Sequence, residues 1–143
     1  MKSKTNSLKI ALADDDADDQ FLFQLALKEA SGESALEIYN NGARLMEALL
    51  QPGADLPHVI FLDMNMPRKN GLQCLEEIRR HESLQHIPVV VLTTSINQAE
   101  IKKVYETGAN LYFRKPSEFP KLVALIEKVC TMDLTSKGQM AFN

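Results

Sequence analysis

Short apolar runs of strand length alternate with longer segments whose apolar residues recur at helical spacing, and this alternation repeats along most of the chain. A strand, a helix and a second strand in succession form the unit from which parallel sheets are built. The sequence therefore predicts an α/β fold with a parallel sheet. The predicted strands are Leu8–Ala13, Ala35–Tyr39, His58–Leu62, Val89–Leu92 and Leu111–Arg114.

A helix is predicted after each of these strands. The first helix is expected to end near Ser31–Gly32. Its buried stripe is predicted to consist of Phe21, Leu22, Leu25 and Ala26. The other helices are expected at Ala43–Leu50, from Leu72 to about His81, before Gly108, and around Leu122, Leu125, Ile126 and Val129.

The length of 143 residues fits one compact domain, because two separate hydrophobic cores would each be small. We expect a folded domain over residues 8–131, a disordered N-terminal segment over 1–7 and a polar C-terminal tail over 132–143. No apolar run is long enough to cross a bilayer and nothing resembles an export signal, so we expect a cytoplasmic protein. Cys74 and Cys130 fall within helical apolar patterns, which predicts reduced core thiols. A net charge of −3 gives no sign of direct DNA binding.

Polar residues follow several predicted strands at the point where each strand ends. In an open parallel sheet, ligands bind beyond the carboxyl ends of the strands, near the reversal of winding direction. We therefore expect these residues to share one edge of the sheet. They are Asp14-Asp15-Asp16 after the first strand, Asp63 after the third, Thr93-Thr94-Ser95 after the fourth and Lys115-Pro116 after the fifth.

The carboxylates of Asp14, Asp15 and Asp63 would repel one another at neighbouring strand ends, so a counter-charge is required. A hard divalent cation meets this need. Mg²⁺, or Mn²⁺ instead, suits the site because Mg²⁺ takes one or two carboxylates and keeps water or phosphate oxygens as its other ligands. With Lys115 included, the residues carry a charge of about −2, which one divalent ion balances.

A cation, a lysine and a hydroxyl around one aspartate are the components that phosphoryl transfer needs. The Asp63 carboxylate could attack a phosphoryl group in line, while the cation and Lys115 neutralise charge and the Thr93 hydroxyl donates a hydrogen bond. The product would be an aspartyl phosphate, whose added charge could draw the hydroxyl and its loop inward.

Each residue also has an ordinary structural explanation. Acids at the start of a helix complement its dipole, and for Asp16, Asp18 and Asp19 this is the role that we predict. Asp63 alone would fit a turn, and Thr93 alone would fit a strand. The joint occurrence of suitable residues at four strand ends favours a functional site.

Four tracts resemble a known family. They are Ile10-Ala11-Leu12-Ala13-Asp14-Asp15, Val59-Ile60-Phe61-Leu62-Asp63-Met64-Asn65-Met66-Pro67 with Gly71, Val91-Leu92-Thr93-Thr94, and Lys115-Pro116. Together they resemble the receiver domain of two-component response regulators from about Leu8 to Cys130. Within that family, the chain is most similar to stand-alone receivers of the bacteriophytochrome-associated type. The resemblance implies a flavodoxin-like, doubly wound, five-stranded parallel sheet of order 2-1-3-4-5 with five helices.

The resemblance also implies roles for single residues. Asp63 would be the phosphorylation site and Asp15 a direct Mg²⁺ ligand. Asp14 would act on the metal mainly through water, and the Asn65 backbone carbonyl would complete the protein ligands.

Three further roles concern switching. Thr93 would be the switch hydroxyl, and Tyr112 the aromatic residue whose rotamer follows Thr93. Lys115 would clamp the phosphate from a cis peptide bond to Pro116.

The implied function is that of a single-domain response regulator in a phosphorelay, which assists its own phosphotransfer and dephosphorylation and is not otherwise an enzyme. A histidine kinase or phosphotransfer protein would donate the phosphoryl group, and an unknown downstream protein would bind the switched face. The chain would be a monomer or a weak homodimer through its fourth helix, fifth strand and fifth helix.

Three other hypotheses remain open. A phosphatase of the haloacid dehalogenase type also uses a strand-end aspartate and Mg²⁺, but it resembles Asp-x-Asp, whereas Asn65 follows Asp63 by two positions. A receiver-like module without phosphorylation would have lost some of the acids or the lysine. A flavodoxin-type cofactor binder would need a phosphate-cradling loop after the first strand, where three aspartates stand instead.

Overall fold

The computed structural model describes residues 7–94 and 97–132, and these residues form a parallel sheet of five strands with five helices. The strands are β1 (Lys9–Ala13), β2 (Ala35–Tyr39), β3 (Val59–Asp63), β4 (Val89–Thr93) and β5 (Leu111–Arg114). Their order in the sheet is β2-β1-β3-β4-β5, and every neighbouring pair is parallel. The predicted fold and strand order are therefore confirmed.

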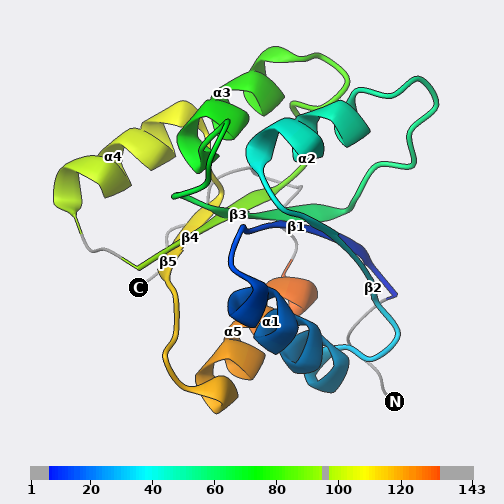
Figure 1. The fold of residues 1–143 in the computed structure, drawn as a ribbon, viewed down its shortest axis with the longest axis vertical. Helices are drawn as coiled ribbons and strands as arrows, with labels where there is room; N and C mark the ends of the chain where they lie inside the picture. The colour runs from blue at the N-terminus through cyan, green and yellow to red at the C-terminus, as the bar shows by residue number, and fades with distance from the viewer. Residues whose placement is uncertain (1–6, 95–96, 133–143) are drawn as a thin grey trace.

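The helices form a layer on each face of the sheet, with α1 and α5 on one side and α2, α3 and α4 on the other (Figure 1). They are α1 (Ala17–Ala30), α2 (Gly42–Leu49), α3 (Gly71–Arg80), α4 (Gln98–Thr107) and α5 (Phe119–Thr131). No helix within residues 7–94 and 97–132 combines the length and the apolar character that a membrane crossing needs. The terminal segments predicted at 1–7 and 132–143 lie almost wholly outside the described residues.

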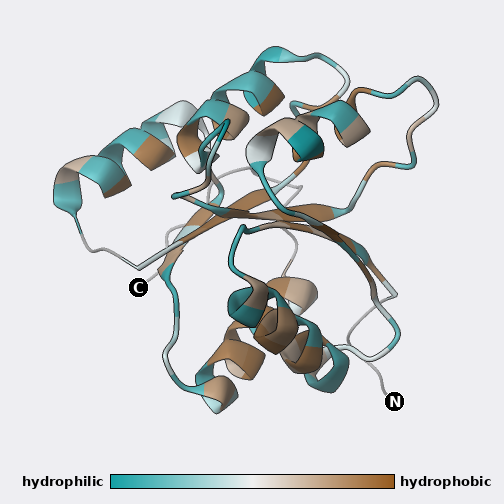
Figure 2. Cartoon of the chain, viewed as in Figure 1, coloured by the Kyte–Doolittle hydropathy of each residue, from teal (hydrophilic) through white to brown (hydrophobic). Residues whose placement is uncertain are grey.

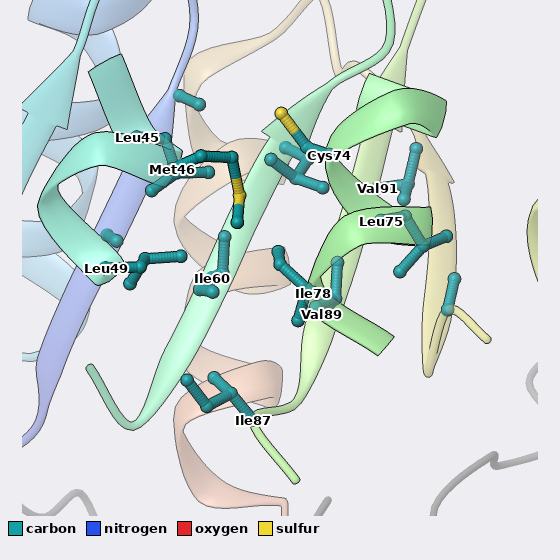
Figure 3. Packing of buried hydrophobic residues seen from close by; sticks show 14 of the residues in the cluster. Leu45, Met46, Leu49, Ile60, Cys74, Leu75, Ile78, Ile87, Val89 and Val91 are labelled. Atoms are coloured by element: carbon teal, nitrogen blue, oxygen red, sulfur yellow. The ribbon is translucent and has the colours of Figure 1, made fainter. Parts of the chain in front are cut away.

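The central strands are apolar throughout because helices cover both of their faces. Every residue of β3 and β4 is buried, and the sheet forms the most hydrophobic layer of the molecule (Figure 2). Beneath α2 and α3, the side chains of Met46, Ile60, Cys74 and Leu75 converge in one cluster (Figure 3). Within the described chain, Cys74 and Cys130 are buried free thiols, as predicted.

The apolar stripe predicted for α1 is wrong in part. Phe21, Leu22 and Leu25 are 59%, 43% and 42% exposed, whereas Ala26 is buried as expected. The buried face is centred instead on Phe23, whose ring packs edge-on against Phe61 of β3 with centroids 5.0 Å apart. Because α1 carries apolar residues around most of its circumference, periodicity could not decide which side meets the sheet.

Arg79 of α3 joins two loops at the amino ends of β4 and β5, the sheet edge opposite the strand-end acids. Its guanidinium donates hydrogen bonds to the backbone oxygens of Gln85, Ile87 and Gly108 and to Asn110 Oδ1, at 2.8 to 2.9 Å. Gly108 has a φ of 121° and ends α4, as predicted. The planar fork of arginine thereby fixes the C-terminal end of α4 against α3.

Arg79→Lys is expected to lower the free energy of unfolding by about 2 kcal/mol, because a lysine ammonium cannot reach the same acceptors at once. Urea denaturation of the two proteins measures the difference. The matched control is Arg80→Lys at the neighbouring exposed position, where we expect a change within about 0.5 kcal/mol. Equal effects of both substitutions would contradict the role assigned to Arg79.

Candidate functional site

The carboxyl ends of β1, β3, β4 and β5 meet at one edge of the sheet, and the structure brings most of the predicted site residues together there. Asp14 follows β1, while Asp63 and Thr93 are the last residues of β3 and β4. Lys115 follows β5, and its Nζ lies 3.1 Å from Asp14 Oδ2 and 3.4 Å from Asp63 Oδ2. Ser95 of the predicted Thr-Thr-Ser run lies outside the described residues.

Asp14, Asp15 and Asp63 form a cluster of carboxylates whose oxygens lie within 4.8 Å of one another. Asp14 and Asp63 are buried, whereas Asp15 is exposed at the mouth of the cluster. The loops orient both buried groups, because the Asp16 N–H donates to Asp14 Oδ1 at 2.9 Å and the Asn65 N–H donates to Asp63 Oδ1 at 3.3 Å. An all-oxygen donor set of this size fits a hard divalent cation.

Burial dominates the ionisation of the two inner acids. It raises the pKa of Asp14 to about 6, although the Asp16 N–H and the charge of Lys115 oppose the shift. Burial also raises the pKa of Asp63, and Lys115 and the Asn65 N–H offset only part of that rise. Without a cation, the folded chain therefore holds two carboxylates that are costly to ionise.

Lys115 has an acidic partner that the sequence analysis missed. Its Nζ donates to Asp19 Oδ2 at 2.7 Å, which is shorter than either distance to Asp14 or Asp63. Burial disfavours the ammonium, but the hydrogen bond with Asp19 and the charges of Asp14 and Asp63 outweigh burial and raise the pKa of Lys115. Asp19 is far from Lys115 in sequence, so no local pattern could have revealed the pair. Asp16, which was predicted to complement the dipole of α1, is the N-cap of that helix, and its side chain accepts a hydrogen bond from the Asp19 N–H.

Thr93 and Tyr112 are linked in a chain of hydrogen bonds that ends on α4. Thr93 is completely buried, and its side chain hydrogen-bonds that of Tyr112. The Tyr112 hydroxyl donates to Glu100 Oε1 at 3.1 Å, and burial together with Glu100 raises the pKa of Tyr112 to about 12. The sequence analysis did not predict this role of Glu100. A movement of the Thr93 side chain would therefore act on α4 through Tyr112.

The loop after β3 is tightly folded against Asp63. A Cβ on Gly71 would lie 2.6 Å from the Asp63 backbone oxygen, so only glycine fits there. Arg68 has a φ of 70°, and the Lys69 N–H donates to the Pro67 oxygen across it at 2.7 Å, which forms a strained three-residue turn. This loop fixes the backbone on which the Asp63 carboxylate stands.

One detail implied by the family resemblance is wrong. The peptide bond between Lys115 and Pro116 is trans, not cis. The trans form is the lower in free energy for most bonds that precede proline. The Lys115 N–H donates to the Thr93 oxygen at 2.7 Å, and the ammonium still reaches the acids of the site.

Comparison with known proteins identifies the class. The family model of the response regulator receiver domain matches residues 10–127, and the chain belongs to this family. It therefore belongs with neither the haloacid dehalogenase-type phosphatases nor the flavodoxin-type cofactor binders considered above.

Individual members of the family are similar to this chain over most of their own length. Response regulator Rcp1 of Synechocystis sp. is 34% identical over 134 residues, which cover 90% of this chain and 91% of Rcp1. The phosphorylated cyanobacterial phytochrome response regulator RcpA has a TM-score of 0.79 and 34% identity, covering 87% of this chain and 91% of RcpA. The Mn²⁺-bound form of Rcp1 has a TM-score of 0.78 and 33% identity, covering 94% of this chain and 99% of Rcp1.

Asp14→Asn is expected to stabilise the metal-free protein. Asp14 has an ordinary pKa of 3.8 and a folded-state pKa of about 6, so the folded state binds the proton more tightly. Ionisation of Asp14 therefore lowers the free energy of unfolding. This loss is absent below pH 4, grows between pH 4 and 6, and is complete above pH 6. We expect the variant to gain about 1 to 3 kcal/mol at pH 7.5, and the gain to disappear towards pH 4.

Urea denaturation with a chelator present, at several pH values, measures this difference. The exposed Asp55→Asn is the matched control and should change stability by less than about 1 kcal/mol. A loss of stability in Asp14→Asn at pH 7.5 would show that the contact with Lys115 outweighs burial.

Proposed function

We propose that this chain is a response regulator that accepts a phosphoryl group on Asp63 from a phosphohistidine and thereby switches a protein-interaction face. One geometric observation carries the proposal. The buried Asp63 carboxylate shares an all-oxygen cluster with Asp14 and Asp15, and Lys115 Nζ lies 3.4 Å from it. Family membership supports the proposal, and a phosphorylated form of the similar protein RcpA is known.

In this proposal, the carboxylates of Asp14, Asp15 and Asp63 and the backbone carbonyl of Asn65 hold Mg²⁺ or Mn²⁺, with Asp14 acting mainly through water. The closeness of the three acids supports this assignment, and so does the Mn²⁺-bound form of the similar Rcp1. A bound divalent cation would neutralise charge on the transferring phosphoryl group.

The chain's own residues would perform the remaining steps. An Asp63 carboxylate oxygen attacks phosphorus, a P–O bond forms, and the P–N bond to the donor histidine breaks with its electron pair leaving on nitrogen. Lys115 pairs with the phosphoryl oxygens as an ammonium, and the Thr93 hydroxyl donates a hydrogen bond to one of them. In this way the domain assists its own phosphotransfer. Dephosphorylation follows when water attacks the same phosphorus, the P–O bond to Asp63 breaks, and inorganic phosphate leaves with the free carboxylate restored.

Switching would follow from the hydrogen bonds of Thr93. If the Thr93 hydroxyl turns to the phosphoryl group, its bond to Tyr112 is lost, and the contact of Tyr112 with Glu100 changes with it. These residues lie on β4, β5 and α4, so the face of α4, β5 and α5 is the proposed output surface. It would bind an unknown downstream protein or a second copy in a weak homodimer.

The partners and setting complete the proposal. A histidine kinase or phosphotransfer protein donates the phosphoryl group, and the chain does not bind DNA directly, in keeping with its net charge of −3. The receiver unit spans residues 8–131, which the family match over 10–127 supports. A cytoplasmic location fits the two free, buried thiols of the described chain, because reducing compartments keep thiols unpaired.

Asp63→Asn should abolish phosphorylation, because an amide cannot form the acyl phosphate. The measurement is the mass increase of the intact protein after incubation with Mg²⁺ and acetyl phosphate. Asp55→Asn, which removes an exposed acid outside the cluster, should be labelled like the parent. Equal labelling of Asp63→Asn and the parent would disprove the assignment of Asp63.

Asp15→Asn should weaken divalent-cation binding by about tenfold or more, because it removes a direct ligand. Mn²⁺ is a suitable probe, since its paramagnetism broadens the amide resonances of residues near the ion. In the parent we expect broadening first around residues 14–15 and 63–65. Asp18→Asn, an equal change of charge at an exposed site of α1, should retain most of the affinity.

A further inference from the structure

Lys115 lies closer to Asp19, which is outside the cluster of Asp14, Asp15 and Asp63, than to the proposed phospho-acceptor. Its Nζ lies 2.7 Å from Asp19 Oδ2, 3.1 Å from Asp14 Oδ2 and 3.4 Å from Asp63 Oδ2. We infer that Asp19 is a positioning residue, which draws Lys115 towards α1, nearer to Asp19 than to Asp63, until an incoming phosphoryl group displaces it. This inference rests on the proposed function and adds a means of regulating the same site.

Of the three acids that pair with Lys115, Asp19 is the most exposed to solvent, so its ion pair is the easiest to separate. The Asp19 side chain is 38% exposed, whereas those of Asp14 and Asp63 are 3% and 8% exposed. Water can therefore solvate the Asp19 carboxylate when the lysine departs, so this pair separates at a lower cost than the more buried contacts with Asp14 and Asp63. The Asp19 backbone is fixed at the start of α1, because its N–H donates to Asp16 Oδ1 at 3.0 Å.

The pair of Lys115 and Asp19 lies beside a cavity. A cavity of about 50 Å³ between α1 and the start of α5 is lined by Asp19, Leu22, Lys115, Pro116 and Leu122, among others. The side chains of Lys115 and Asp19 therefore border open space on the α1 side of the site, where either can change rotamer when the pair separates.

The distribution of charge in the site also supports this role for Asp19. Asp14, Asp15 and Asp63 form the cluster that fits a cation, and Asp19 is not one of its members. Once a cation engages that cluster, Asp19 remains as the acid that competes with a phosphoryl group for Lys115. Its negative charge also repels the incoming anion, so both effects of Asp19 slow phosphorylation.

Asp19→Asn should therefore increase the rate of phosphorylation by subsaturating acetyl phosphate by about threefold to tenfold, as expected for loss of a partly exposed ion pair. In this reaction a P–O bond forms on Asp63 and acetate leaves with the electrons of the broken P–O bond. The half-saturating concentration of acetyl phosphate should fall in the variant. The affinity for beryllofluoride in the presence of Mg²⁺ should increase. Asp19→Glu should restore values near those of the parent.

The matched control is Asp18→Asn, because Asp18 is exposed in the same helical turn and makes no ion pair among the described residues. A second readout needs no cation: the Lys115 ammonium signal in ¹⁵N spectra of the metal-free protein should be sharp in the parent and in Asp18→Asn, and exchange-broadened in Asp19→Asn.

The outcomes separate the two proposals. If the parent is not phosphorylated on Asp63, the proposed function fails. If the parent is phosphorylated and Asp19→Asn reacts no faster than Asp18→Asn, or leaves the ammonium signal unchanged, the role of Asp19 is overturned.

Discussion

Repulsion among three aspartates at one edge of the sheet governs the organisation of this site. Two of them are buried, and burial raises the pKa of both above its ordinary value. Lys115 supplies one positive charge, which leaves an excess of negative charge that a divalent cation can balance. The site therefore favours binding of a cation, and a cation together with Lys115 makes the same place attractive to a phosphoryl group.

The rest of the fold holds this unfavourable cluster in place. Both central strands are buried throughout, so the strand ends that carry Asp63 and Thr93 have little freedom to move. The close approach of Gly71 fixes the loop behind Asp63. At the opposite edge, Arg79 fixes the C-terminal end of α4. Because the strands, the loop behind Asp63 and the end of α4 are fixed in this way, changes at the site are expected in side-chain contacts and not in the backbone.

Two such contacts surround the proposed phospho-acceptor. Thr93 binds Tyr112, which binds Glu100 on α4, so a change at Thr93 can reach the surface. Lys115 binds Asp19 on α1, and an incoming phosphoryl group would have to compete for it. The first contact relates to output and the second to the ease of phosphorylation. They lie on opposite faces of the sheet, which allows each to be altered by mutation without the other.

The sequence by itself determined the five βα units, because periodicity and turn residues act locally. It also predicted which residues end the strands, and parallel strands bring such ends to a common edge. The tertiary structure decided which face of α1 is buried, since most of that helix is apolar and only its packing against the sheet and α5, including the contact of Phe23 with Phe61, selects a side. It also decided the pairing of Lys115 with Asp19, which joins residues 96 positions apart and depends on how α1 packs.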